Sequence, residues 1–300
     1  MDERGLMRKA VVDIGTNTFN LLIADCLNDS VHVIHSEKRG VSIGMGGINE
    51  GRITEEAMTR ALKALKEFES AIQNHEVESV KLIATSAVRD ADNSALFKER
   101  VKSEIGRDLV VIDGVEEANF IFKGVSLCCP FEKKSMIMDI GGGSTEFILA
   151  DSSGIIALES MDIGVSRLFQ MFNCSDPFTE ENILEIEAFI ENKSDGFFED
   201  KEVEILIGSS GTFETFYELI NKRPFPHGDQ TTELELDPFL HSLDELIFST
   251  LEERNQNDFI IPIRKKMAPF AAVKTRWVIR QLNVRKVLIS PFSLKEGALL

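Results

Sequence analysis

The sequence predicts an α/β protein made of two duplicated domains that face each other across a cleft. The chain has 300 residues, about twice the length of a usual single domain. Apolar segments with the spacing of strands and of helices alternate along both halves. A stretch of thirteen residues beginning at Asp13 also recurs without a gap at Asp139, with five identical positions. The length therefore predicts two domains, and the repeat indicates that they are related.

The repeated stretch predicts the same β-hairpin in each half. Each copy has an apolar strand (residues 10–12 and 136–138), a tight Asp-x-Gly turn, and a second apolar strand (21–24 and 147–150). Chance similarity between two hairpins of like composition is the alternative, but the turn residues match as well. We place the first domain at 1–125 and the second at 126–300, with the last helix free to pack back toward the first domain.

The first half is expected to alternate helices and strands after its hairpin. Thr54 is a suitable N-cap for a helix with apolar residues at helical spacing, and Gly106 is a suitable end for a later one. Polar and turn residues mark a junction, with a hinge expected at 124–134. The predicted elements are a helix at 54–72, a strand at 80–84, a helix at 94–105, a strand at 109–112 and a helix after Gly114 that carries Glu116 and Glu117 near its start.

The second half repeats this alternation. Residues 223–238, which contain three prolines and a glycine, are interpreted as an irregular excursion or a short hairpin. Ser293 and Glu296 have the spacing of a capping box and predict a final helix. The other predicted elements are a helix opened by Thr179, a strand at 204–207, a glycine turn leading into a helix, a basic helix at about 263–281 and a strand at 286–290.

Both hairpin turns combine carboxylates with a backbone that an anion can approach. Asp13, Asp139 and Glu146 offer the hard oxygens that Mg²⁺ takes alongside phosphate and water. Gly141, Gly142 and Gly143 carry no Cβ, so consecutive N–H groups can form a concave nest for phosphate. Two such turns predict a site that holds a chain of phosphates from both sides. Additional donors are Thr16, Asn17, Thr18, Ser144 and Thr145.

A third glycine turn, residues 207–212, follows a strand and opens a helix. The N-terminus of that helix offers unpaired N–H groups to an anion, so Gly211 and Thr212 are further candidate phosphate ligands. An ordinary strand-to-helix loop is an equally good interpretation of this turn alone.

Composition excludes several classes of partner. With 33 basic and 50 acidic residues the net charge is −17, which argues against binding nucleic acid or an anionic membrane surface. No apolar run could span a membrane, and an early Asp leaves no room for a signal peptide, so we expect a cytoplasmic protein. Four cysteines without C-x-x-C spacing are expected to be reduced thiols rather than zinc ligands.

One segment departs from the acidic total. Residues 259–294 contain no Asp or Glu and eight Lys or Arg. Ion pairs with the acidic remainder are one interpretation, and a strip that guides a chain of phosphates at the exit of the cleft is the other. The eight residues are Arg264, Lys265, Lys266, Lys274, Arg276, Arg280, Arg285 and Lys286.

Taken in order and spacing, the motifs resemble those of the exopolyphosphatase/guanosine pentaphosphate phosphohydrolase (Ppx/GppA) family over essentially the whole chain. This match depends on many pieces rather than on one glycine turn. They lie at residues 12–18, 44–46, 84–89, 116–118, 139–146, 164–168, 208–212 and 293–297.

The resemblance implies actin-like domains, of the acetate-kinase, sugar-kinase and chaperone-ATPase type with a ribonuclease H-like fold. It implies a Mg²⁺-dependent (or Mn²⁺-dependent) hydrolase that removes terminal phosphate from inorganic polyphosphate or guanosine pentaphosphate. By similarity, Glu117 would be the general base. Asp139 and Glu146, with Asp13 nearby, would hold the cation, and Arg89 and Arg167 would contact phosphate.

Two departures from the family pattern affect this expectation. Asn119 stands where the family usually has Arg, so one cationic contact is missing. The sequence also resembles a short form that lacks a C-terminal helical domain of the HD type, and a homodimer through the second domain is one hypothesis. A kinase or ATPase of the same fold, and a non-catalytic sensor of polyphosphate or an alarmone, remain alternative functions.

Overall fold

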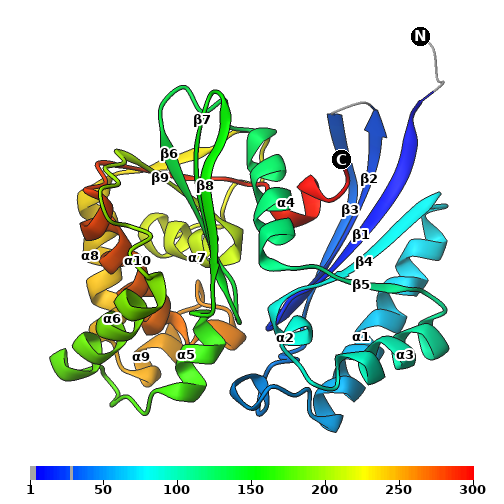
Figure 1. Cartoon of the computed structure of the whole chain (residues 1–300), viewed down its shortest axis with the longest axis horizontal. Helices are drawn as coiled ribbons and strands as arrows, with labels where there is room; N and C mark the ends of the chain where they lie inside the picture. Colours follow the sequence, from blue (N-terminus) through cyan, green and yellow to red (C-terminus); the bar gives the residue numbers. More distant parts are fainter. Residues whose placement is uncertain (1–4, 28–29) are drawn as a thin grey trace. The chain divides into compact units, whose positions relative to one another are not determined.

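A computed structural model describes residues 5–27 and 30–300 of the chain. Residues 1–4, part of the N-terminal stretch used to argue against a signal peptide, lie outside this description. The chain forms two compact units: unit 1 contains Met1–Leu127 and Phe292–Leu300, and unit 2 contains Cys128–Pro291. Each unit is built around one mixed sheet with helices (Figure 1), so the predicted α/β fold class is confirmed.

The sheet of unit 1 has the order β3-β2-β1-β4-β5. The first three strands form an antiparallel meander, and β4 and β5 run parallel to β1. The strands are β1 (Met7–Ile14), β2 (Thr18–Leu27), β3 (Ser30–Gly40), β4 (Ser79–Ala84) and β5 (Leu109–Val111). The helices are α1 (Glu55–Asn74), α2 (Ser86–Arg89), α3 (Ser94–Ile105), α4 (Gly114–Ser126) and α11 (Leu294–Gly297).

Helices cover both faces of this sheet. Ala10, Val12 and Ile14 point to one face and join the core that α1 and α3 close. The side chains between them point to the other face, where Lys9 Nζ donates to the carbonyl of Leu299, 2.9 Å away, just beyond α11. Asp13 therefore lies on the α11 face of the sheet, and α4 packs against α11 (Figure 1).

The sheet of unit 2 has the order β10-β11-β9-β6-β7-β8. Here too a meander of three strands is joined by parallel strands, β9 and β11, and β10 is added at the edge. The strands are β6 (Ser135–Ile140), β7 (Thr145–Asp151), β8 (Gly154–Met161), β9 (Ile205–Ser209), β10 (Thr232–Leu234) and β11 (Lys286–Ile289). The helices are α5 (Val165–Met171), α6 (Glu180–Ser194), α7 (Ser210–Asn221), α8 (Leu236–Phe248), α9 (Leu251–Gln256) and α10 (Ala268–Leu282).

The two sheets repeat each other in register as well as in order. Asp13 pairs with Asn20 across the first hairpin, and Asp139 pairs with Glu146 across the second. The register also shifts at equivalent points, between residues 23 and 24 of β2 and between residues 149 and 150 of β7. All of these positions are related by the same offset of 126 residues that the sequence repeat shows. The duplicated hairpin is therefore confirmed.

Most predicted helix ends are also confirmed. The Thr54 hydroxyl accepts from the backbone N–H of Ala57, and Gly106 ends α3 with a left-handed φ of 81°. Ser293 and Glu296 form the expected capping box at α11. Helix termini were predictable because their signals are local in sequence.

The prediction needs correction in three respects. The third strand of each meander, β3 and β8, was not predicted, because their partly exposed residues lack a clear apolar pattern. Residues 223–238 are neither wholly irregular nor a hairpin: they contain β10, which pairs with β11, and the start of α8, whose first turn tolerates Pro238. The basic helix begins at Ala268 rather than at 263, after a 3-10 turn at Pro262–Arg264.

Candidate functional site

A row of polar side chains crosses four neighbouring strands of unit 2. Asp139 on β6 is paired with Ser209 on β9 and with Glu146 on β7, and Glu146 is paired with Ser160 on β8. Residues paired in this way point to the same face of a sheet, with Cβ atoms about 5 Å apart. The order Ser209, Asp139, Glu146, Ser160 thus places two carboxylates side by side between two hydroxyls.

The hydroxyls hold the carboxylates from the outside of the row. Ser209 Oγ donates to Asp139 Oδ2 over 3.0 Å, and Ser160 Oγ donates to Glu146 Oε1 over 2.7 Å. Asp139 is 7% exposed and Glu146 is 1% exposed. Two adjacent buried carboxylates repel each other, so the arrangement favours a bound cation. Neither serine was identified from the sequence, because only the register shows that they are neighbours.

The donor set of this row suits a hard divalent cation. Carboxylate oxygens are preferred by Mg²⁺, which is commonly bound through one or two carboxylates together with phosphate oxygens and water. Among the described residues, no group of three or more His, Cys, Asp and Glu could hold a metal ion. The residues present therefore fit a cation shared with a phosphate ligand better than a closed cage of protein ligands.

The glycine loop at 141–144 connects the two strands that carry these carboxylates. The carbonyls of Gly141, Gly142 and Gly143 accept hydrogen bonds of 2.8–3.3 Å from the N–H groups of residues 164–167, at the start of α5. In a trans peptide the N–H points opposite to the C=O. The N–H groups of Gly142, Gly143 and Ser144 are therefore directed away from α5.

The loop and α5 are in close backbone contact. A Cβ at Gly164 would overlap the carbonyl oxygen of Gly142, so only glycine fits there. Arg167 contributes from the same helix: its Nε donates to the carbonyl of Gly143 over 3.1 Å, and its Nη2 lies 3.7 Å from Asp162 Oδ1. The structure thus brings the candidate Arg167 to the glycine loop, on the carbonyl side.

The third glycine turn joins the same neighbourhood. Thr212 Oγ1 donates to the carbonyl of Ile140 over 3.3 Å, next to the 141–144 loop. Ser210, between β9 and the glycine, has φ of 69°. A Cβ at Gly211 would overlap the guanidinium of Arg264, whose Nη1 donates to Thr215 Oγ1 over 2.8 Å. Arg264 is therefore a cation at the start of α7 that the sequence did not assign to the site.

Thr145 has a different environment from the one predicted. Its side chain is fully buried, and its hydroxyl accepts from Lys274 Nζ over 2.5 Å. Lys274 belongs to α10 and is also fully buried. Burial lowers the pKa of Lys274 to about 7, and the opposite charge of Glu146 counteracts part of that effect.

The candidate residues of unit 1 occupy the matching hairpin. Asn20 stands at the position that Glu146 has in unit 2, and its Nδ2 donates to Asp13 Oδ2 over 2.9 Å. Thr16 and Asn17 lie in the turn, and Thr18 opens β2. The main chain of this turn is fixed from outside: the Asn17 carbonyl accepts from two backbone N–H groups at 2.9 Å, those of residues 41 and 42. This hairpin pairs its carboxylate with an amide.

Glu117 is distinguished from its neighbour Glu116 by its surroundings. Glu117 is 6% exposed and accepts from Arg89 Nη1 over 2.8 Å, whereas Glu116 is exposed. Arg89 also lies 3.4 Å from Asp90 Oδ1. The side chain of Asn119 donates to the carbonyl of Val115 on its own helix over 2.7 Å. The structure thus brings Arg89 and Glu117 together, as a partly buried ion pair within unit 1.

The basic segment at 259–294 is largely accounted for by contacts inside unit 2. Arg276 pairs with Asp244, Arg280 with Glu187 and Lys286 with Glu233. Lys274 is buried rather than displayed on a surface. The ion-pair interpretation therefore holds for Arg276, Arg280 and Lys286, whereas the buried Lys274 fits neither interpretation.

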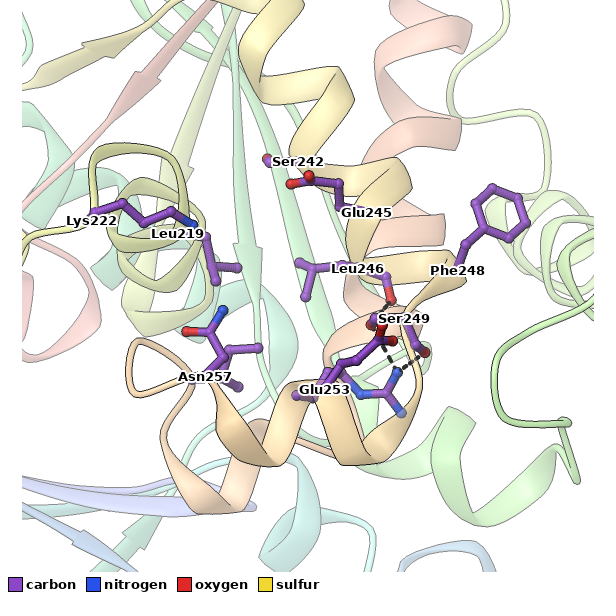
Figure 2. A pocket seen from close by; sticks show the side chains of 11 residues that line it. Leu219, Lys222, Ser242, Glu245, Leu246, Phe248, Ser249, Glu253 and Asn257 are labelled. Carbon is purple, nitrogen blue, oxygen red and sulfur yellow. Dashed lines mark hydrogen bonds between the residues drawn. The ribbon is translucent and has the colours of Figure 1, made fainter.

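A pocket of about 450 Å³ lies among α7, α8 and α9 of unit 2, away from the glycine loops (Figure 2). Leu219 and Lys222 line it from the C-terminal end of α7, whereas Gly211 and Thr212 lie at the other end. At 1.5 Å per residue these ends are roughly 12 Å apart. The pocket is therefore separate from the candidate site.

No helix of the described part of the chain is long and apolar enough to cross a membrane.

Comparison with known proteins identifies relatives of this chain. The sequence model of the Ppx/GppA phosphatase family matches residues 22–300. The chain is 33% identical over 227 residues to "Exopolyphosphatase 2" of Mycobacterium tuberculosis, and the match covers 70% of each protein. It is 30% identical over 214 residues to "Guanosine-5'-triphosphate,3'-diphosphate pyrophosphatase" of Photobacterium profundum, covering 70% of this chain and 43% of that one.

A solved structure is similar over nearly the full length. The crystal structure of an exopolyphosphatase from Cytophaga hutchinsonii has a TM-score of 0.93 and 37% sequence identity, and the match covers 98% of this chain and 96% of that chain. The similarity therefore includes both units.

Proposed function

The chain belongs to the Ppx/GppA phosphatase family, whose named members hydrolyse phosphoanhydride bonds, and we propose that it releases terminal phosphate from inorganic polyphosphate or guanosine pentaphosphate with the help of Mg²⁺ or Mn²⁺. The observation that carries this proposal is the pairing of Asp139 with Glu146 at the two ends of the glycine loop. Cation ligands and phosphate ligands are then adjacent in the chain and in space.

In this proposal unit 2 supplies the cation ligands and most phosphate contacts. Asp139 and Glu146 hold the cation, oriented by Ser209 and Ser160. When bound, the divalent cation neutralises charge on the phosphate oxygens. Loop N–H groups, directed away from α5, donate to those oxygens without needing to move. The other proposed phosphate contacts in unit 2 are Arg167, Gly211 and Thr212.

Unit 1 supplies the proposed base and further phosphate contacts. Glu117 accepts a proton from the attacking water, and the partly buried ion pair with Arg89 fixes where its carboxylate lies. Asn20 keeps Asp13 oriented, so we assign Asp13 a supporting role as the proposed cation ligand of unit 1. Thr16, Asn17, Thr18 and Arg89 are the proposed phosphate ligands of this unit.

The experiment compares two adjacent glutamates. Orthophosphate release is measured from long polyphosphate and from guanosine pentaphosphate, with Mg²⁺ and with EDTA, for wild type, Glu117→Gln and Glu116→Gln. We expect Glu117→Gln to lower kcat by about 10²–10⁴ with little change in KM, because a base acts in the transition state. Glu116→Gln is the matched control, since its side chain is exposed on the same turn; its kcat should stay within about twofold of wild type.

Each alternative function has a distinct result in the same assay. Equal activity of Glu117→Gln and wild type would remove Glu117 from the reaction. Tight binding of either substrate by wild type with no phosphate released over hours would favour a sensor. Transfer of phosphate from ATP to an acceptor would instead favour a kinase.

A further inference from the structure

Lys274 is a fully buried lysine in the helix α10, whose other buried residues are mostly apolar. An ammonium group removed from water costs several kcal/mol unless it is well compensated, so fully buried lysines are rare. The ion pairs of Arg276 and Arg280 do not include it. Its retention in the core therefore needs an explanation.

The contacts of Lys274 lie at the base of the glycine loop. Its Nζ donates to Thr145 Oγ1 over 2.5 Å and to the carbonyl of Ile163 over 2.6 Å. Thr145 directly follows the loop at 141–144. Ile163 directly precedes Gly164, whose N–H donates to the loop carbonyl of Gly143 over 3.1 Å. One ammonium group thus joins the two segments whose hydrogen bonds set the direction of the loop N–H groups.

The position also has an electrostatic consequence. Thr145 and Glu146 are successive residues of β7, so their side chains point to opposite faces of the sheet. Lys274 contacts Thr145 and therefore approaches β7 from the face opposite to the carboxylate row. With about 3.8 Å between successive Cα atoms, its charge lies within roughly 10 Å of the loop. Such a charge attracts an anion at the loop and repels a cation at the carboxylates.

We propose that Lys274 is a buried positioning residue that holds the glycine loop against α5 and, when protonated, places a positive charge beneath it. This inference rests on the proposed function, in which the loop binds phosphate. In this proposal the charge of Lys274 strengthens phosphate binding at the loop, which repulsion from Asp139 and Glu146 would otherwise weaken.

The test depends on two effects of opposite sign: removing the charge of Lys274 should weaken anion binding at the loop and strengthen cation binding at the carboxylates. Binding of tripolyphosphate in EDTA and binding of Mn²⁺ alone are measured by calorimetry for wild type and Lys274→Met at pH 6.0, where a lysine with a pKa of about 7 is mostly charged. We expect tripolyphosphate to bind about tenfold more weakly, the size of a unit-charge interaction over roughly 10 Å at an effective dielectric constant near 20. Mn²⁺ should bind at least about threefold more tightly, because a like charge has been removed.

A purely structural role would weaken both ligands together, and that result would overturn the proposal, as would unchanged binding of both. Arg280→Gln is the matched control: it removes one positive charge from an exposed position of the same helix and should change neither constant by more than about twofold.

Two further outcomes are separable. Methionine should be tolerated, because it removes the cost of burying an ammonium group, which offsets the loss of the two hydrogen bonds to Thr145 and Ile163. If neither Lys274→Met nor Lys274→Gln shows a cooperative thermal transition while Lys274→Arg does, the residue serves folding and the proposal is overturned. If wild type releases no phosphate from long polyphosphate or guanosine pentaphosphate in the presence of Mg²⁺, the proposed function itself has failed. If it does release phosphate and Lys274→Met binds tripolyphosphate as tightly as wild type, only this inference has failed.

Discussion

The contact between α4 and α11 determines whether replacing a glycine there by alanine raises or lowers the stability of unit 1. A Cβ at Gly124 would overlap the carbonyl oxygen of Ser293 and lie 2.8 Å from its carbon. A Cβ at Gly297 would overlap the carbonyl oxygen of Phe120 and lie 2.7 Å from the nitrogen of Gly124. The two helices therefore meet backbone to backbone, through a glycine on each side.

Gly124→Ala should destabilise unit 1 even though the same change in an open helix is stabilising. Alanine normally gains about 0.5–1 kcal/mol over glycine in a helix. Here the added methyl forces the helices apart by at least about 1 Å, and overpacking of this kind costs about 1–3 kcal/mol. The same movement accommodates a methyl at Gly297, so the double variant should lose less than the two single losses together.

Urea unfolding provides the measurement. Ser126→Ala is the control, because it raises helix propensity on the same helix at an exposed position and should leave stability within about 0.5 kcal/mol. Glu117 is two helical turns before Gly124, so a displaced α4 should also lower kcat. If Gly124→Ala leaves the free energy of unfolding unchanged or raises it, the inferred close contact is wrong.

Two further predictions concern hydrogen bonding and ionisation in unit 2. Ser209→Ala should weaken Mn²⁺ binding by about tenfold in a calorimetric titration, because it removes the donor that orients Asp139. The control is Ser135→Ala, which changes a buried serine at the far end of β6 that donates to a main-chain carbonyl. It should leave the Mn²⁺ dissociation constant unchanged, and equal effects of the two substitutions would refute the orienting role of Ser209. Burial raises the pKa of the Cys174 thiol to about 11, so its alkylation by iodoacetamide should be about tenfold slower than that of free cysteine at pH 8 and should rise up to about pH 11. The alkylation rate of Cys174 is measured by peptide mass spectrometry. A rate that levels off near pH 9 would contradict this prediction.

The fold was predictable where the sequence signals were local or repeated. The hairpins, the helix begun by Thr54 and the capping box of Ser293 depend on neighbouring residues, and each was confirmed. The edge strands β3 and β8 were missed for the opposite reason. Their side chains are half solvated, so pairing with a neighbouring strand, rather than apolar periodicity, holds them in the sheet.

The acidic and glycine residues of the candidate site were predictable, but the residues that hydrogen-bond to them and orient them were not. Ser160 and Ser209 are distant in sequence from the carboxylates they contact, and no spacing rule relates them. Lys274 has no local signal that separates it from the other basic residues of its helix. The choice of Glu117 over Glu116 needed the family resemblance, and the structure shows a physical difference between them, since one is buried against Arg89 and the other is exposed.

The duplicated hairpins indicate why the cation is assigned to one unit. The same pairing of strands puts Asp13 beside Asn20 and Asp139 beside Glu146. An amide donates to its neighbouring carboxylate and so supplies a partner from within the protein, as Asn20 does at 2.9 Å. A second carboxylate cannot donate, and it adds a repulsion that the hydroxyls reduce and that the charge of Lys274, on the opposite face of β7, offsets only in part. Unit 2 therefore has the greater need for a cation, and a single divergent position of the repeat, residue 20 against residue 146, is enough to account for the asymmetry.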